Sequence, residues 1–166
     1  MVQYTNITHT FEPVYNADTK ILILGTFPSV KSREYGFYYG HPQNRFWRVL
    51  AEVTGSPLPT DVEEKKSFLL QNKIGIWDVI KSCSIKGSDD SSITDVSAND
   101  FSKIFSETEL SVVAANGAKA YELYNRYVFP STQRKIVKLP STSPANAAWS
   151  LERLCAAYKE VIALKD

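Results

Sequence analysis

Four short apolar runs mark the chain, at residues 21–24, 74–77, 111–115 and 135–139. The first and third are continuous rather than alternating, which is typical of strands buried on both faces of a parallel sheet. Helical patterns lie between the runs. Because strands that alternate with helices indicate an α/β fold, we predict a three-layer α/β/α sandwich around a mostly parallel, four-stranded central sheet.

The helical patterns have recognisable limits. Pro42 suits the first position of a helix, apolar residues follow at helical spacing as far as Val53, and Gly55 ends the element. A second pattern covers residues 118–127. Residues 148–163 carry an apolar stripe, which predicts a closing amphipathic helix.

Two stretches lack such a pattern. Residues 84–100 are rich in serine and aspartate and show little periodicity, so they predict a long surface loop. Residues 1–18 are expected to form an extended N-terminal arm. Residues 1–166 together then make a single domain, a size that buries enough surface to fold without a disulfide or a metal.

Composition and charge exclude several classes of protein. The chain has no apolar run near the roughly 18 residues of a membrane span, and its first residues lack the features of a secretory signal, so we expect a cytoplasmic protein. Cys83 and Cys155 are far apart and are expected to be reduced. We expect no metal and no cofactor. The net charge of +1 gives no general attraction to nucleic acid, so any such role depends on a local patch.

Turn-forming residues gather at the predicted carboxyl ends of the strands, where open α/β sheets place their working groups. The first strand runs into GTFPS (residues 25–29), and the last runs into LPSTSPANA (residues 139–147). Between them lies GFYYGHPQNRFW, residues 36–47. GTFPS has the spacing of neither a dinucleotide-binding nor a Walker loop. Taken singly, each segment also fits a structural role, such as a tight turn, a core aromatic or a helix cap.

In this order, the segments resemble the uracil-DNA glycosylase superfamily along nearly all of residues 20–165. Residues 36–47 are similar to the bacterial mismatch-specific uracil/thymine glycosylases. The closer resemblance is to the hypoxanthine (deoxyinosine)-DNA glycosylase branch. Its hallmarks are a tyrosine pair before Gly/Ala-His-Pro-x-Asn and a final LPSTSPANA, which stand here at Tyr38 to Asn44 and at Leu139 to Ala147.

The resemblance implies a monomeric, monofunctional DNA glycosylase of base excision repair. Such an enzyme hydrolyses the N-glycosidic bond of a flipped-out deaminated base in double-stranded DNA, here hypoxanthine and also uracil. A mismatch-specific uracil/thymine glycosylase and an inactive DNA-binding member remain alternatives. Phe27 keeps the inactive alternative open, because it stands where related enzymes carry a water-holding Asn or Asp. An unrelated small α/β hydrolase is a further alternative, although the chain lacks a GxSxG elbow.

The resemblance also implies a set of site residues. Asn44 matches the catalytic asparagine of the hypoxanthine branch and is expected to hold a water with its amide oxygen. Tyr39 is expected to stack on the base, and backbone N–H groups after the first strand to meet its carbonyl oxygen. The expected base-binding residues are Gly25, Thr26, Phe27, Pro28 and Tyr39.

The final loop is expected to hold the DNA strand. Its hydroxyl and amide groups would contact phosphates, and its small residues would fill the space that the base leaves in the duplex. The residues expected to do this are Ser141, Thr142, Ser143, Pro144, Ala145 and Asn146. Nearby positive charge is expected from Lys31, Arg33, Arg45 and Arg48.

Overall fold

The computed structural model describes residues 3–9 and 11–165. Its central sheet is parallel and has the strand order β3-β2-β6-β7. Each strand forms from one of the apolar runs, which confirms the predicted α/β fold and its four-stranded sheet. The strands are β2 (Ile21–Gly25), β3 (Ile74–Asp78), β6 (Val112–Asn116) and β7 (Val137–Leu139).

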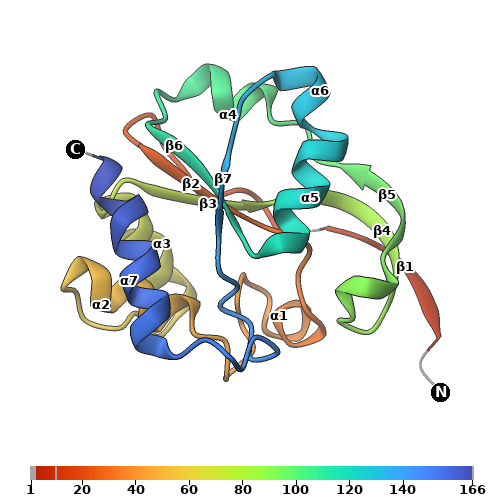
Figure 1. Cartoon of the computed structure of the whole chain (residues 1–166), viewed down its shortest axis with the longest axis horizontal. Helices are drawn as coiled ribbons and strands as arrows, with labels where there is room; N and C mark the ends of the chain where they lie inside the picture. Colours follow the sequence, from red (N-terminus) through yellow and green to blue (C-terminus); the bar gives the residue numbers. More distant parts are fainter. Residues whose placement is uncertain (1–2, 10, 166) are drawn as a thin grey trace.

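Helices cover both faces of this sheet (Figure 1). One face packs against α2 (Phe46–Thr54), α3 (Val62–Gln71) and α7 (Leu151–Ile162), and the other against α4 (Ser102–Glu107) and α5 (Ala118–Tyr127). Alternate side chains of β2 enter the two cores, as the period of a strand requires. The continuous apolar run of β2 therefore reflects burial on both faces.

A second, antiparallel sheet has the order β1-β4-β5, and the sequence did not predict it. It consists of β1 (Tyr4–Thr8), β4 (Ile80–Lys86) and β5 (Thr94–Ala98). The prediction of a long loop over residues 84–100 is wrong, because this stretch holds the end of β4, the 3-10 turn η1 (Asp90–Ser92) and β5. The β4–β5 pairing contains register shifts, which break the alternation that reveals a strand. Within the predicted arm, β1 pairs with β4 along its whole length.

The helix that bears the Asn44 motif begins later than predicted. Asn44 donates its backbone N–H to the carbonyl of His41 and accepts the N–H of Phe46 with its side chain. Residues 41–44 therefore form a turn, and Pro42 is not a first helical residue. Gly55 ends α2 in the left-handed region (φ 66°), as predicted.

Three short helices complete the described chain. They are α1 (Val30–Tyr35), α6 (Phe129–Thr132) and the 3-10 turn η2 (Ala163–Lys165). The helices predicted over residues 118–127 and 148–163 are confirmed as α5 and α7. In the part of the chain that is described, no helix has the length and apolar character needed to cross a membrane.

Candidate active site

A cavity of about 320 Å³ opens at the carboxyl edge of the parallel sheet. This volume lies near the lower end of the roughly 300–1,000 Å³ of ligand sites and suits a small ligand. Residues 25–29 and 141–145 line it together with Tyr39 and Asn44. The turn after β2 and the loop after β7 therefore face one cavity, as expected of segments that leave the same edge of a sheet.

On one side of the cavity, three polar side chains form what we call the amide cluster, namely Asn44, Asn116 and Thr142. The Thr142 hydroxyl donates to Asn44 Oδ1 at 2.9 Å and accepts from Asn116 Nδ2 at 3.0 Å. The Thr142 N–H donates to Asn116 Oδ1 at 3.0 Å. Thr142 is fully buried, so these bonds replace its contacts with water.

The geometry of Asn44 differs from the predicted one. Its Oδ1 accepts from both the Phe46 N–H and the Thr142 hydroxyl. A carbonyl oxygen has two lone pairs, so this acceptor is saturated. Because a backbone N–H can only donate, the bond from Phe46 also fixes which amide atom is the oxygen. Among the described residues Nδ2 has no hydrogen-bond partner, so Asn44 offers the cavity a donor and not an acceptor.

The loop after β7 is held from inside by Arg45. Its guanidinium donates to the backbone carbonyls of Ser143, Asn146 and Trp149. Arg45 thus positions this loop, and its charge is not free to form the exposed patch predicted for it.

Within the loop, two residues predicted to contact DNA form hydrogen bonds inside the protein. The Thr142 hydroxyl is occupied in the amide cluster and is not available to a phosphate. The Asn146 side chain donates to the Ser141 carbonyl and is held within the loop, whereas Pro144 and Ala145 line the cavity.

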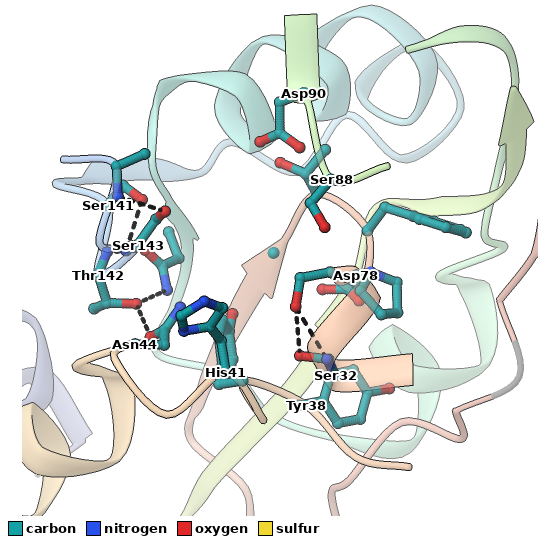
Figure 2. Close-up of a pocket in the computed structure, with 18 of the residues that line it drawn as sticks. Ser32, Tyr38, His41, Asn44, Asp78, Ser88, Asp90, Ser141, Thr142 and Ser143 are labelled. Carbon is teal, nitrogen blue, oxygen red and sulfur yellow. Dashed lines mark hydrogen bonds between the residues drawn. The ribbon is translucent and has the colours of Figure 1, made fainter. Parts of the chain in front are cut away.

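The opposite side of the cavity is formed by the turn after β2 and by Asp78 at the end of β3. Figure 2 shows Asp78 across the cavity from Asn44 and Thr142. Ser29 ends the turn and caps α1 through a bond from the Ser32 N–H. Within the described residues, no hydrogen bond is made by the N–H groups of Thr26 and Phe27.

Asp78 forms a buried pair with His9, which we call the carboxylate pair. His9 Nε2 lies 2.8 Å from Asp78 Oδ2, and the two side chains are only 2% and 5% exposed. A Cβ atom built on Gly25 would lie 2.4 Å from Asp78 Oδ1 and 3.0 Å from Tyr39 Oη. The absence of a side chain at Gly25 therefore lets the carboxylate and the hydroxyl approach the end of β2.

Tyr39 is held rigidly beside this pair. Its ring stacks on Phe46 with a centroid distance of 3.9 Å and an interplanar angle of 17°. Its backbone is in the left-handed region (φ 53°), which is unusual for a bulky residue and occurs at functional sites. Its buried hydroxyl makes no hydrogen bond of good geometry in the described structure, although the Asn116 side chain lies near it. Burial, and then the negative charge of Asp78, raise the pKa of Tyr39, while Asn116 lowers it slightly, so the hydroxyl stays protonated.

Three members of the amide cluster and the carboxylate pair were not predicted, namely His9, Asp78 and Asn116. Asp78 and Asn116 end buried strands, so the rule that directed attention to GTFPS also applies to them. His9 is separated from Asp78 by 69 residues, and no local pattern indicates their contact. Across residues 3–9 and 11–165, no group of three or more His, Cys, Asp or Glu side chains is placed to hold a metal ion.

The match of residues 12–163 to the family model for the uracil DNA glycosylase superfamily shows that the chain belongs to this superfamily. A Methanosarcina acetivorans protein named hypoxanthine DNA glycosylase is 40% identical over 149 residues, which cover 89% of this chain and 93% of that protein. A Methanosarcina barkeri protein of the same name is 40% identical over 114 residues, 68% of this chain and 72% of that protein.

A solved structure shares the fold. The solution NMR structure of a candidate uracil DNA glycosylase from Methanosarcina acetivorans superposes with a TM-score of 0.78 at 34% identity. It covers 95% of this chain and 99% of the other. The resemblance to the superfamily and the predicted fold class are confirmed.

Proposed function

We propose that this protein is a monofunctional DNA glycosylase of base excision repair that releases hypoxanthine from deoxyinosine in double-stranded DNA, with uracil as a second substrate. One observation carries the proposal: the two segments typical of the hypoxanthine branch, residues 38–44 and 139–147, both contribute to the lining of one cavity. The names of the Methanosarcina relatives agree with this substrate. The proposal includes a monomeric enzyme in a reducing, cytoplasmic compartment, in keeping with two free cysteines.

The cavity has the features that a flipped base requires. Extrusion of a nucleotide costs a few kcal/mol, which contacts in the pocket must offset. We assign the free N–H groups of Thr26 and Phe27 to the carbonyl oxygen of the base. Phe46 covers one face of the Tyr39 ring, and Tyr39 lines the cavity, so we assign stacking on the base to the other face of the ring. Gly25 and Pro28 complete this side of the pocket.

We assign the catalytic role to Asn44, acting as a donor. Its Nδ2 would hold a water through the water oxygen, which leaves a second lone pair to attack C1′ of the sugar. An amide cannot deprotonate water at neutral pH. The water can nevertheless react if the C–N bond breaks first, because the resulting oxocarbenium ion accepts a weak nucleophile. The bonds from Phe46 and Thr142 fix the direction of the amide before the substrate arrives.

The DNA strand is assigned to the loop after β7. Ser141 and Ser143 would contact phosphates, and Pro144 and Ala145 would enter the space left by the base. Arg45 keeps this loop in shape without touching DNA.

A base panel on the purified protein tests this proposal. Duplexes with a single inosine, uracil, xanthine or mismatched thymine are incubated with the protein, and alkali then opens any abasic site. We expect cleavage first at inosine and more slowly at uracil. A gel shift on abasic DNA without cleavage of any duplex would instead support an inactive binding protein, the alternative that Phe27 raises. Preferential cleavage at mismatched thymine or uracil would support the mismatch-specific alternative.

A further inference from the structure

The hydrogen-bond donors and acceptors beside Gly25 indicate which chemical group of a ligand the cavity recognises. Asp78 Oδ1 lies over Gly25, and the unpartnered N–H groups of Thr26 and Phe27 follow directly in the chain. Residues whose acceptor and donors are unpaired in the described structure therefore line the same cavity at the end of β2. The matching ligand edge has a donor next to an acceptor. A lactam, C(=O)–N–H, presents the two in the order opposite to that of the adenine edge, so the order in the pocket distinguishes them.

His9 determines which oxygen of Asp78 is available. The Phe11 N–H donates to His9 Nδ1 at 3.1 Å, so this nitrogen carries no proton. The proton is then on Nε2, which donates to Asp78 Oδ2. Within the described residues Oδ1 has no hydrogen-bond partner, and Asp78 lines the cavity. His9 thus orients the carboxylate and leaves one oxygen to act as an acceptor.

We infer that Asp78 is a specificity-determining residue that accepts the ring N–H of a flipped lactam base, while the N–H groups of Thr26 and Phe27 donate to the adjacent carbonyl oxygen. This inference rests on the proposed function and deepens it. Deamination of adenine replaces a ring nitrogen lone pair and an exocyclic amine by a ring N–H and a carbonyl. With the carboxylate opposite the ring nitrogen and the backbone N–H groups opposite the exocyclic atom, the deaminated edge is attracted and the edge of adenine is repelled. The pocket then recognises the chemical change itself.

A purely structural role for the carboxylate pair predicts different behaviour. If the pair only fastens the N-terminal segment to β3, its loss weakens the fold and lowers all activities alike. If Asp78 reads the base, its loss changes the ratio between bases. The ratio is therefore the informative readout.

The test uses Asp78→Asn in the full chain. In this variant His9 Nε2–H still needs an acceptor, so the new amide oxygen turns to His9 and its NH₂ group faces the cavity. Binding is measured to matched duplexes that carry 2′-fluorinated deoxyinosine or 2′-fluorinated deoxyadenosine, whose glycosidic bonds resist cleavage. We expect the preference for inosine over adenosine to fall by about 10- to 150-fold, the range for a hydrogen bond to a charged group.

The control is Asp90→Asn, which removes the same charge from another position on the lining of the same cavity. Its inosine-to-adenosine ratio should stay close to that of the wild type. A second experiment needs no variant and covers the case in which Asp78→Asn fails to fold. The wild-type protein should excise hypoxanthine but not N1-methylhypoxanthine, in which the ring N–H is missing.

The outcomes separate the two proposals. If the wild type excises no deaminated base, the proposed function fails. If it excises hypoxanthine, but Asp78→Asn keeps the wild-type ratio or N1-methylhypoxanthine is excised equally fast, the role of Asp78 is overturned and the proposed function stands.

Discussion

The two sides of the cavity differ in how completely their polar atoms are used. In the amide cluster, the Asn44 acceptor is saturated, and Asn116 and Thr142 are joined by two hydrogen bonds. Across the cavity, Asp78 Oδ1 and the N–H groups of Thr26 and Phe27 have no partner among the described residues. A protein interior rarely leaves such groups unpaired unless a ligand or water completes them.

This difference indicates that the two sides of the cavity have different roles. The saturated side resembles a frame that holds a single group, the Asn44 amide nitrogen, in a fixed direction. The open side has the free donors and acceptor that a base can complete. Preorganisation of the first kind favours catalysis, because no reorganisation is needed when charge develops. Unpaired groups of the second kind favour selectivity, because a wrong ligand leaves them unsatisfied.

The largest effect is expected from substitution of Asn44, the side chain whose direction the amide cluster fixes. Asn44→Ala should lower single-turnover excision of hypoxanthine by about 10²–10³, or roughly 3–4 kcal/mol, the scale of losing one positioned polar group. Binding to abasic DNA should change little. Rapid-quench kinetics measures the first quantity and a gel shift the second. A folded Asn44→Ala protein with the wild-type rate would place catalysis elsewhere.

Asn44→Asp tests whether this position acts as a hydrogen-bond donor or as an acceptor. A carboxylate can still accept from the Phe46 N–H and the Thr142 hydroxyl, so the variant should fold. It has no donor for the water, so we expect it to be nearly as slow as Asn44→Ala. Excision at or above the wild-type rate would show that this position acts as an acceptor.

Thr142→Val tests the amide cluster without removing the Asn44 side chain itself. The substitution keeps the shape of the side chain but removes the hydroxyl shared by Asn44 and Asn116. Buried partners left without a bond cost about 1–3 kcal/mol, so the free energy of unfolding should fall by this amount. Urea denaturation measures the loss, and excision should slow by roughly 10-fold, equivalent to about 1.4 kcal/mol, because Asn44 is held less firmly. Thr108→Val is the matched control, since it removes a half-buried hydroxyl that donates to the Ile104 carbonyl and does not line the cavity.

The smallest effects concern Tyr39, whose ring and hydroxyl should behave differently. Tyr39→Ala should weaken binding to a duplex with the uncleavable inosine analogue by roughly 1–3 kcal/mol, the usual loss of base stacking. Tyr39→Phe keeps the ring and removes a buried hydroxyl that lacks a partner, so it should raise the free energy of unfolding by about 1 kcal/mol. Equal damage from both substitutions would mean that the hydroxyl has a function.

The sequence predicted the parallel sheet better than the antiparallel one, for a physical reason. Strands β2 and β6 are buried throughout and appear as continuous apolar runs. The exposed strand β5 is polar, and its pairing with β4 slips in register, so neither a run nor an alternation marks it. The prediction of a loop there followed from composition alone.

The site was predicted in part. The motifs identified Asn44 and the two loops that line the cavity, because each lies next to a recognisable turn. They could not reveal that Asn44 offers its nitrogen, since this depends on bonds from Phe46 and from the distant Thr142. The pairing of His9 with Asp78 likewise exists only once β1 lies beside β4.

The central claim is that this cavity releases an intact base from DNA, and product analysis tests it most directly. An inosine-containing duplex is incubated with the wild-type protein, free bases are quantified by liquid chromatography and mass spectrometry, and strand breaks are counted before and after alkali. We expect free hypoxanthine in an amount equal to the alkali-labile sites, with the strand intact before alkali. No free hypoxanthine, or strand breaks that precede alkali, would contradict a monofunctional hypoxanthine-DNA glycosylase.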